Sequence, residues 1–425
     1  MAAVLLVSTA LCYAKPAPPT LEVGTCLTGY THFATIQLAV NAAPAGATVL
    51  VCPGIYPEQV VIGEALTLKG VTLAGASGAT IAPPPGGTFT TYPNLVPTSF
   101  LTPIAPQVLI QNTKSVTLTN LTVDGTNDLI PSCTPYLVGV LFQNASGALS
   151  DMAVVNQILG PGLTGCQGGL AILVQSGGGT STVDVANSVV QNFAKNGITG
   201  SEAGTKLTIE NTTIVGIGVT PLVAQNGVEL GFGATGSITD STVSDIAYGD
   251  PFSVASVGIL LVGSPNVTVK GNVVTNTDTG VYTISAGTEG SASGATIANN
   301  EISSTHAWDG IALCSNNNSV TGNVISASDE SGVWTGEGCF EPNGAVSGTA
   351  NKIKSNTINR ACAGLMFSGG ATPAGNTVGN NNSFFNTDTT VLTADSCPAA
   401  PSPDLSLAVG SSAGGGSHVQ ISPAR

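Results

Sequence analysis

A unit of 22 residues, Gly310–Ser331, repeats with variations along most of the chain and constrains the fold more than any other feature. It opens with a glycine and a short apolar stretch, crosses a polar turn, and continues through two further apolar stretches that flank a bend at Gly322. A unit this short cannot bury its own apolar face, so it is stable only when copies stack on one another. The opening glycine recurs at Gly139, Gly169, Gly197, Gly227, Gly258, Gly280, Gly310, Gly332 and Gly364.

The bend recurs as well, and its position holds Asn, Asp, Gly or Ser in every copy: Asn120, Asp151, Asn187, Asn211, Asp240, Gly271, Asn299, Gly322, Ser355 and Asn380. Because Asn, Asp and Gly tolerate a left-handed backbone, this column predicts the same sharp bend in each coil. In later copies the next position is also asparagine, at Asn272, Asn300, Asn323, Asn356 and Asn381. We expect these amides to bond to one another at the β spacing. The short segments between bends are rich in Val, Ile and Thr, so the repeat predicts an all-β, right-handed parallel β-helix.

The rest of the chain divides around this solenoid. An amphipathic helix before the first coil would cover the exposed apolar end of the stack. Pro-, Ser- and Gly-rich composition predicts a disordered tail at the other end. The expected segments are a signal-like stretch at 1–14, a linker at 15–30, a single domain at 31–398 with its capping helix at about 32–43 and coils at about 48–385, and a tail at 399–425.

The charge balance limits the partners. Net charge is −14 with only ten basic residues, which disfavours binding to nucleic acid and to anionic membranes. After the N-terminal segment, no apolar run is long enough to span a membrane. Both ends of the solenoid look capped, so we expect a monomer. No motif calls for a cofactor or a metal, although calcium binding stays open.

The cysteines point to an oxidising compartment. Of nine, Cys12 lies in the N-terminal apolar segment and the other eight fall into consecutive pairs about one coil apart. Pairing by proximity predicts the disulfides Cys26–Cys52, Cys133–Cys166, Cys314–Cys339 and Cys362–Cys397. Disulfides and a signal-like segment favour a protein that is secreted, periplasmic or at the cell surface.

The run from Thr35 to Gly70, TIQLAVNAAPAGATVLVCPGIYPEQVVIGEALTLKG, resembles the opening of pectinesterases and of many bacterial proteins in the pectin lyase-like β-helix superfamily. The resemblance implies the β-helix fold. It does not imply an activity, because this opening forms a cap in those proteins.

The candidate catalytic and sugar-binding residues lie mainly in the insertions that precede the opening glycines. Loops that leave from one corner of stacked coils share a face, and neighbouring coils lie about 4.8 Å apart. Two carboxyl groups roughly 5–10 Å apart can divide acid and base roles in glycoside cleavage, and tryptophan offers a flat face to a sugar ring. The acid/base candidates are Asp278, Asp309, Asp329 and Glu330, and the sugar-binding candidates are His306, Trp308, Arg360, Tyr248 and Asp250. A second outward stripe is predicted two residues after the glycines, at Glu229, Tyr282, Trp334 and Met366.

Part of this cluster also resembles, loosely, the polygalacturonase site on the same fold. Asn276-Thr277-Asp278 matches the NTD element of that family, and Asp309 matches the second aspartate of its aspartate pair. The resemblance implies that Asp278 and Asp309 are the acid/base pair and that Arg360 contacts substrate. The chain departs from the pattern at Ser331-Gly332-Val333, where the family has a GHG histidine.

Three functions remain open from the sequence. The first is a secreted β-helix protein that cleaves or modifies a polysaccharide, of hydrolase, lyase or epimerase type, in a lateral cleft. The second is a non-catalytic rod that binds carbohydrate or serves as a surface or matrix protein. The third is an extracytoplasmic accessory protein for the assembly of copper enzymes. The proposed cleft requires that Gly280, Gly310 and Gly332 lie one above another.

Overall fold

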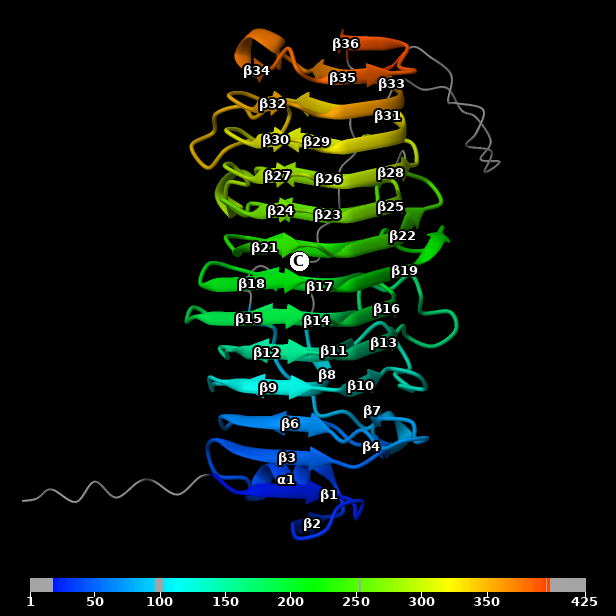
Figure 1. Cartoon of the computed structure of the whole chain (residues 1–425), viewed down its shortest axis with the longest axis vertical. Helices are drawn as coiled ribbons and strands as arrows, with labels where there is room; N and C mark the ends of the chain where they lie inside the picture. Colours follow the sequence, from blue (N-terminus) through cyan, green and yellow to red (C-terminus); the bar gives the residue numbers. More distant parts are fainter. Residues whose placement is uncertain (1–17, 96–101, 252–253, 395, 398–425) are drawn as a thin grey trace, which may run out of the picture.

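The computed structural model describes residues 18–95, 102–251, 254–394 and 396–397. Strands wind into coils that stack along the long axis of the molecule, so that successive coils follow one another in sequence from bottom to top (Figure 1). All strand pairings between coils are parallel, and the described chain is a right-handed parallel β-helix, as the repeat predicts.

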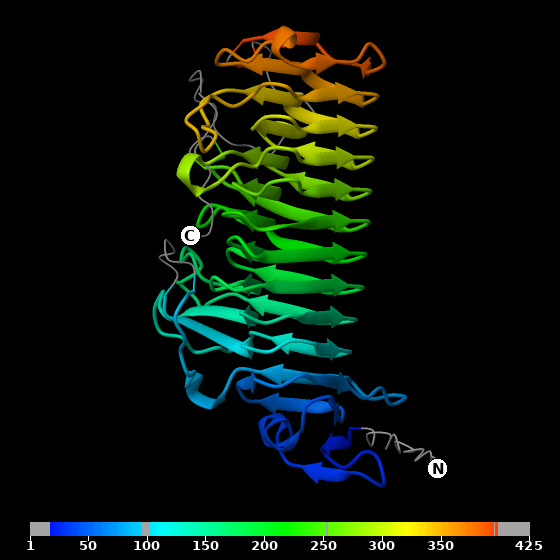
Figure 2. The same cartoon turned by 90° about the vertical axis from the view of Figure 1, so that its left-hand side faces the viewer.

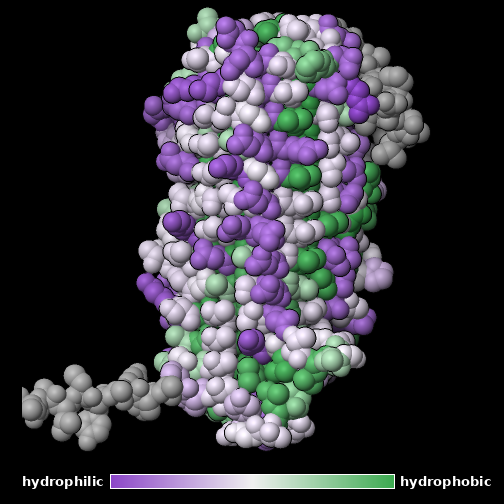
Figure 3. All heavy atoms as spheres, in the orientation of Figure 1, coloured by the Kyte–Doolittle hydropathy of each residue, from purple (hydrophilic) through white to green (hydrophobic). Residues whose placement is uncertain are grey.

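One side of each coil contributes a strand to a 14-stranded sheet, here called sheet A. Its inward residues are apolar and its outward residues are mostly polar, which gives the alternating burial of a sheet with one covered face. Hydrophilic side chains line up in vertical rows on the face of the molecule seen in Figure 3. In spatial order the strands are β2 (Thr31–Phe33), β1 (Thr20–Val23), β3 (Ala47–Val51), β6 (Leu66–Gly70), β9 (Val116–Thr119), β12 (Gly147–Ser150), β15 (Ser181–Ala186), β18 (Thr205–Glu210), β21 (Thr235–Thr239), β24 (Thr268–Lys270), β27 (Thr296–Ala298), β30 (Ser319–Thr321), β32 (Lys352–Lys354) and β34 (Thr377–Val378).

The second strand of each coil belongs to a set that we call the corner stack, because it leads to the corner before the opening glycine. Its strands are β4 (Gly54–Pro57), β7 (Ala79–Ala82), β10 (Leu121–Asp124), β13 (Ala153–Gln157), β16 (Val189–Phe193), β19 (Thr213–Thr220), β22 (Thr242–Tyr248), β25 (Val273–Thr277), β28 (Glu301–Thr305), the first halves of β31 (Val324–Gly336) and β33 (Thr357–Ser368), and β35 (Ser383–Phe385).

The third strand of each coil belongs to the glycine stack, which carries the column of opening glycines. Its strands are β5 (Val60–Ile62), β8 (Ile104–Gln111), β11 (Tyr136–Gln143), β14 (Leu170–Gln175), β17 (Asn196–Ser201), β20 (Asn226–Gly231), β23 (Val257–Val262), β26 (Thr279–Ile284), β29 (Ile311–Cys314), the second halves of β31 and β33, and β36 (Thr389–Thr393). Three short 3-10 turns, Pro85–Gly87, Gly287–Glu289 and Pro373–Gly375, lie in the excursions between strands.

The glycine column is confirmed for Gly280, Gly310 and Gly332. Val281 pairs with Ile311 and Ile311 with Val333, which sets these glycines one above another. A Cβ atom on Gly280 would lie 2.4 Å from the carbonyl oxygen of Gly310, so a larger residue would clash with the next coil.

Gly169, by contrast, is not part of this column, and its assignment from sequence is wrong. The registers Val138–Leu170 and Leu170–Asn196 place Ala171 beneath Gly197. Two consecutive glycines precede Leu170, and the second of them was taken as the opening glycine although the column position is two residues later.

The predicted bend is confirmed in nine of its ten copies. The non-glycine members from Asn120 to Ser355 have φ between 48° and 58°, and Gly271 and Gly322 have φ of 70° and 69°. Asn380 does not have a positive φ, because the last coil is irregular there.

The asparagine ladder beside the bend is confirmed for four of its five members. Each Nδ2 donates to the Oδ1 of the next residue: Asn272 to Asn300 at 3.0 Å, Asn300 to Asn323 at 2.9 Å, and Asn323 to Asn356 at 2.9 Å. The last step goes from Asn356 to Asn382 at 3.1 Å, and not to Asn381 as expected. Asn381 instead donates to Ser355 Oγ at 2.6 Å, one column away.

The N-terminal cap is a helix, α1 (Ile36–Ala42), with Thr35 as N-cap. Glu58 accepts hydrogen bonds from the first two helical N–H groups, and Ile36, Ala39 and Val40 are buried against the first coils. The helix is shorter than the expected 32–43 because residues 31–33 form β2. In the side view of Figure 2 it lies at the lower end of the stack.

The fold begins within the predicted linker 15–30, since β1 pairs with β3 along its whole length. The predicted signal-like segment 1–14, with Cys12, and the predicted tail 399–425 lie outside the described residues.

All four predicted disulfides are present: Cys26–Cys52, Cys133–Cys166, Cys314–Cys339 and Cys362–Cys397. Among the residues that the structure describes, no helix has the length and apolar character that a membrane span requires.

Candidate functional site

The outer side of the glycine stack carries the densest set of buried acidic and aromatic side chains. Along each strand, residues that alternate with core residues point away from the core: Val281, Ile311 and Val333 belong to the central apolar core, whereas their outward neighbours form a separate apolar cluster. We call this surface the outer face. Its column two residues after the glycines holds Thr199, Glu229, Leu260, Tyr282, Ala312, Trp334 and Met366.

Two of the predicted acids, Asp309 and Glu330, come together at this face. Asp309 directly precedes Gly310, and Glu330 lies two residues before Gly332 on the next coil. Both side chains are buried, with 1 % and 7 % of their surface exposed. Ser331 fixes Asp309, because its N–H and its Oγ–H donate to Asp309 Oδ1 at 3.2 and 2.6 Å.

Both carboxyl groups have raised pKa values. Burial raises the pKa of Asp309 well above its usual range, and the nearby Glu330 charge raises it further, against the hydrogen bonds from Ser331. Burial also raises the pKa of Glu330, to about 7. The pair therefore retains a proton near neutral pH and titrates as a unit.

Three aromatic side chains, Tyr282, Trp308 and Trp334, belong to this region of the outer face. Tyr282 and Trp334 lie on the outer face in an edge-to-face arrangement with ring centroids 6.2 Å apart. Burial raises the pKa of Tyr282, and the charge of Asp309 adds to this effect. The indole N–H of Trp334 donates to Ser368 Oγ at 2.8 Å. The indole N–H of Trp308, the residue directly before Asp309, donates to the Pro251 carbonyl at 2.9 Å.

Asp278 has a different environment. Its Oδ2 accepts hydrogen bonds from the backbone N–H groups of Tyr248 and Ser256 at 2.8 and 2.7 Å, so it joins the two ends of the loop between β22 and β23. Its Oδ1 is buried and has no hydrogen-bond partner among the described residues. Burial raises the pKa of Asp278 to about 8, in opposition to these hydrogen bonds.

Asp329 and His306 lie at the corner before the glycine stack, in a chain of polar contacts that crosses several coils. Asp329 Oδ2 accepts from the Ala307 N–H at 2.7 Å, and its pKa is raised by burial. His306 Nε2 lies 2.6 Å from Asn276 Oδ1, and Asn276 donates to Asp245 Oδ1 at 2.5 Å. Burial lowers the pKa of His306, while the Asp329 charge partly opposes this shift.

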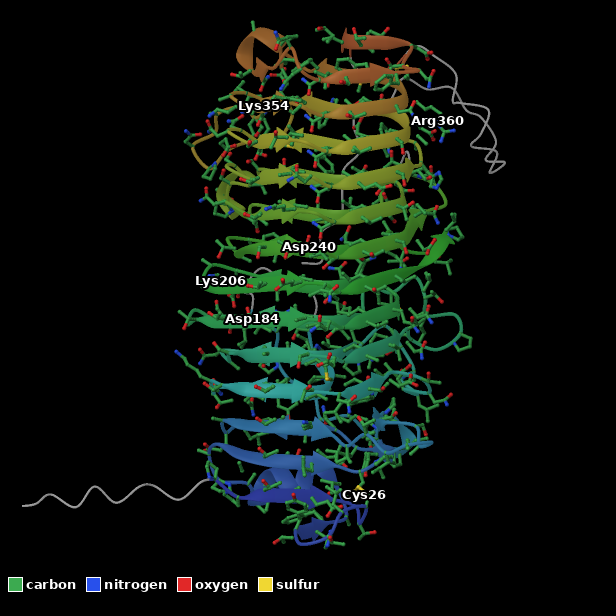
Figure 4. All side chains as sticks on the ribbon, in the orientation of Figure 1. Cys26, Asp184, Lys206, Asp240, Lys354 and Arg360 are labelled. Atoms are coloured by element: carbon green, nitrogen blue, oxygen red, sulfur yellow. A yellow bond between two sulfur atoms is a disulfide. The ribbon has the colours of Figure 1, made fainter. Side chains whose placement is uncertain are left out.

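The remaining predicted sugar-binding residues lie toward the periphery. Arg360 has φ 58° and is exposed at the corner of the coil above; Figure 4 shows it at the right-hand edge of the molecule. Tyr248 is half-buried and Asp250 is exposed in the loop after β22. The predicted site residues therefore do not form one site. Asp309 and Glu330 form a pair, Asp278 binds the backbone of the loop between β22 and β23, and His306 and Asp329 lie in the polar contacts at the corner.

Sequence reasoning missed one polar cluster on the outer face. Its members are all buried: Lys195, which directly precedes β17, Asn196 and Thr199 on β17, and Asn226 and Glu229 on β20. The sequence predicts an outward position only for Glu229. Lys195 could have pointed to the cluster, because it is one of only ten basic residues and directly precedes a strand of the repeat.

The described residues offer one group with the spacing of metal ligands, Glu22 with Cys26 and Cys52. These two cysteines form a disulfide, so the group does not fit a metal site.

Comparisons with known proteins agree with the architecture. Residues 170–343 match the family model described as a right-handed β-helix region. No curated protein matches the sequence. Among solved structures, the A-module of the mannuronan C-5 epimerase AlgE4 of Azotobacter vinelandii is 12 % identical with a TM-score of 0.52, covering 91 % of this chain and 95 % of its own.

Two further structures are similar at lower TM-scores. The Dettilon tailspike protein is 17 % identical with a TM-score of 0.49, covering 88 % of this chain and 68 % of its own. A DFA-IIIase from Arthrobacter chlorophenolicus A6, in complex with DFA-III, is 15 % identical with a TM-score of 0.42, covering 92 % and 87 %. The repeat, the stacked coils and the family match at residues 170–343 together identify the fold of the chain as a right-handed parallel β-helix.

Proposed function

We propose that this protein cleaves or modifies a polysaccharide outside the cytoplasm, with Asp309 and Glu330 as its acid/base pair. The observation that carries the proposal is the position of these two carboxyl groups on neighbouring coils of the outer face, where burial raises both pKa values and the charge of Glu330 raises that of Asp309 further. A carboxyl pair that holds one proton near neutral pH supplies both a proton donor and a base.

In glycoside cleavage, the protonated member would transfer its proton to the leaving oxygen, while the ionised member would act as base or nucleophile on the other side of the bond. The hydrogen bonds from Ser331 hold Asp309 in one orientation, which is the positioning that such transfer needs. Tyr282, of which 7 % is exposed, would provide the aromatic contact for a sugar ring, and Trp334 would hold it from behind.

Two further observations support the setting. Four disulfides favour an oxidising compartment such as the periplasm or the extracellular medium. The mannuronan epimerase that shares the fold acts on a polysaccharide. In this proposal Asp278 and Asp329 position loops and His306, and do not exchange protons with the substrate.

The test is a panel of neutral and uronate polysaccharides, incubated with the protein with and without calcium and analysed for products. We expect Asp309→Asn and Glu330→Gln each to lower kcat by about 100-fold or more while substrate binding and Tm change little. Asp184→Asn on sheet A (Figure 4) is the matched control and should retain full activity. Unchanged turnover in both site variants would overturn the assignment.

The competing function is a rod that binds carbohydrate without catalysis. The low exposure of Asp309 favours it, since a carboxyl group that is 1 % exposed has limited access to a substrate. Saturable binding of a polysaccharide with no product from any member of the panel would establish this function instead.

A further inference from the structure

The described chain turns back on itself after its last strand. β36 lies above β33 and β31 at the upper end of the stack (Figure 1). Cys397, which follows β36, is bonded to Cys362 on the coil below. The N–H of Cys397 donates to the carboxylate of Glu330, on the coil below that one. We call Ser396–Cys397 the return segment, because it leads from the upper end back toward the Asp309–Glu330 pair.

The strand register places the crosslink directly over this pair. In the pairing of β31 with β33, Ser331 lies opposite Ala363, with a bulge just before it. Cys362 precedes Ala363 and Glu330 precedes Ser331, so Cys362 lies above Glu330. The disulfide therefore fixes Cys397 next to the carboxyl group that its N–H contacts.

The return segment also covers part of the outer face. Cys397 packs against the outward apolar cluster that contains Tyr282 and Trp334. Beneath this cover, Asp309 and Glu330 are 1 % and 7 % exposed. A general acid or base has to come within hydrogen-bond reach of its substrate. The N–H of Cys397 instead takes up a hydrogen-bonding position of the Glu330 carboxylate, so the pair is closed to substrate in this form.

The return segment is attached differently from the coils beneath it. The strands β33 and β36 are joined by regular parallel pairing from Ala363–Thr389 to Phe367–Thr393. Among the described residues, no strand pairing includes Ser396 or Cys397, and Ser396 is exposed. The return segment can therefore leave the outer face without breaking any pairing between coils, once the disulfide no longer holds it.

We infer that the return segment, locked by Cys362–Cys397, is a cover that keeps the Asp309–Glu330 pair latent, and that reduction of this disulfide by a dithiol opens the pair to substrate. This inference rests on the proposed function. The thiolate of the dithiol attacks one sulfur of the disulfide, and its second thiol resolves the mixed disulfide. The protein gains two electrons and two protons as two thiols, and the dithiol is oxidised to a disulfide. In an oxidising compartment the crosslink persists, so the covered form is the stored one.

The experiment has two readouts. The first is the coupling of an amine to Glu330 by a carbodiimide, located by mass spectrometry of peptides, and the second is turnover of the polysaccharide panel. We expect Cys397→Ser and Cys362→Ser each to raise the labelling of Glu330 and the kcat/KM by about tenfold or more, because each removes the crosslink. Wild-type protein treated with a dithiol below its Tm should show the same increases without any substitution.

The matched control is Cys133→Ser combined with Cys166→Ser. This disulfide spans 33 residues, against 35 for Cys362–Cys397, and joins the excursions before β11 and β14. Its loss should leave the labelling of Glu330 and the turnover as in the wild type. Asp309→Asn added to Cys397→Ser should keep the gain in labelling and abolish the gain in turnover.

Asp278 serves as an internal reference for unfolding, because its side chain is 1 % exposed and lies away from the return segment. A gain in labelling at Asp278 as large as that at Glu330 would reflect general unfolding and would overturn the inference. Equal labelling of Glu330 in the crosslinked and opened proteins would overturn it as well.

The two readouts also separate this inference from the proposed function. If opening raises the labelling of Glu330 but no form of the protein yields a product, the cover stands and the proposed function fails. If the crosslinked wild type already shows turnover that depends on Asp309, and opening does not increase it, only the inference is removed. Unchanged labelling together with no product from any form would overturn both.

Discussion

Asp278 and Asp309 come from equivalent corners of neighbouring coils, yet their surroundings give them different properties. Asp309 meets a second carboxyl group, whereas Asp278 accepts from two backbone N–H groups and has its other oxygen buried without a described partner. Burial disfavours the charged form of Asp278 more than the hydrogen bonds from Tyr248 and Ser256 favour it, so the carboxyl group is more stable with a proton on it. The raised pKa of Asp278 is thus a property of the folded state and links stability to pH.

We predict that the protein is more stable at pH 5 than at pH 8. The pKa of Asp278 is raised to about 8 in the folded protein, so the folded state binds this proton more tightly than the unfolded state does. This contribution is fully present below the unfolded pKa of about 4 and is lost as pH rises through about 8. One pKa unit corresponds to about 1.4 kcal/mol, so the effect should be visible as a fall in apparent Tm.

The control for this prediction is Asp278→Asn, which keeps an oxygen for the two N–H donors and removes the titration. Its Tm should depend less on pH between 5 and 8 than that of the wild type. An equally steep Tm–pH profile in the variant would show that other groups, such as Glu330 or Asp329, set the pH dependence.

At the scale of the element, the excursion between β31 and β32 is fastened to the solenoid by one carboxylate. Glu341 accepts from the hydroxyls of Ser285, Ser293 and Ser291 at 2.8, 2.6 and 2.5 Å. Burial alone would raise the pKa of Glu341, but these hydrogen bonds outweigh it and lower the pKa. The disulfide Cys314–Cys339 provides a second attachment at the start of the same excursion.

Glu341→Ala should therefore release the end of this excursion. We expect a loss of about 2–3 kcal/mol in the local stability, because three hydroxyls lose a charged acceptor, and faster proteolysis between residues 337 and 348. Glu337→Gln, which changes an exposed carboxylate of the same excursion, should leave the cleavage rate unchanged. Since the pKa of Glu341 is lowered, acidification below about 4.5 should loosen the wild-type excursion in the same way. Equal cleavage rates for all three proteins would contradict this role.

The repeat made the coils, the bends and the disulfide pairs predictable, because each depends on local sequence spacing. The bend requires a left-handed residue at one position per coil, and the column from Asn120 to Ser355 shows it directly. Two kinds of feature were not predictable. Gly169 and Asn381 were misplaced because insertions shift the register between coils, and only the pairing of strands fixes it.

The candidate site depends on contacts between coils, which sequence spacing does not determine. Asp309 and Glu330 meet, whereas Asp278 turns to Tyr248 and Ser256 and Asp329 to Ala307. Each outcome depends on the side-chain direction at a corner and on the loop that packs there. The buried polar cluster around Lys195 and Glu229 was missed for the same reason, since its members come from two coils about 30 residues apart.

In the whole molecule, stability comes mainly from interactions between neighbouring coils, because the strands of each coil pair with those of the coil above and the coil below. Contacts with two neighbouring coils stabilise each internal coil, and the asparagine ladder adds to this where it is present. The end coils have only one neighbour. The two ends are the places where opening should start, and each carries a disulfide: Cys26–Cys52 at the first coils and Cys362–Cys397 at the last.

We predict that replacing Cys397 by Ser opens the upper end without affecting the middle of the solenoid. Cys362 and Cys397 are 35 residues apart, and loss of such a crosslink removes roughly 3–4 kcal/mol of stabilisation from the segment that it closes. Hydrogen exchange should then accelerate in β35, β36 and the second half of β33, while β14, β17 and β20 exchange as in the wild type. Acceleration spread evenly over all coils would show instead that the molecule opens as one cooperative unit, and the nearest-neighbour description would not hold for this protein.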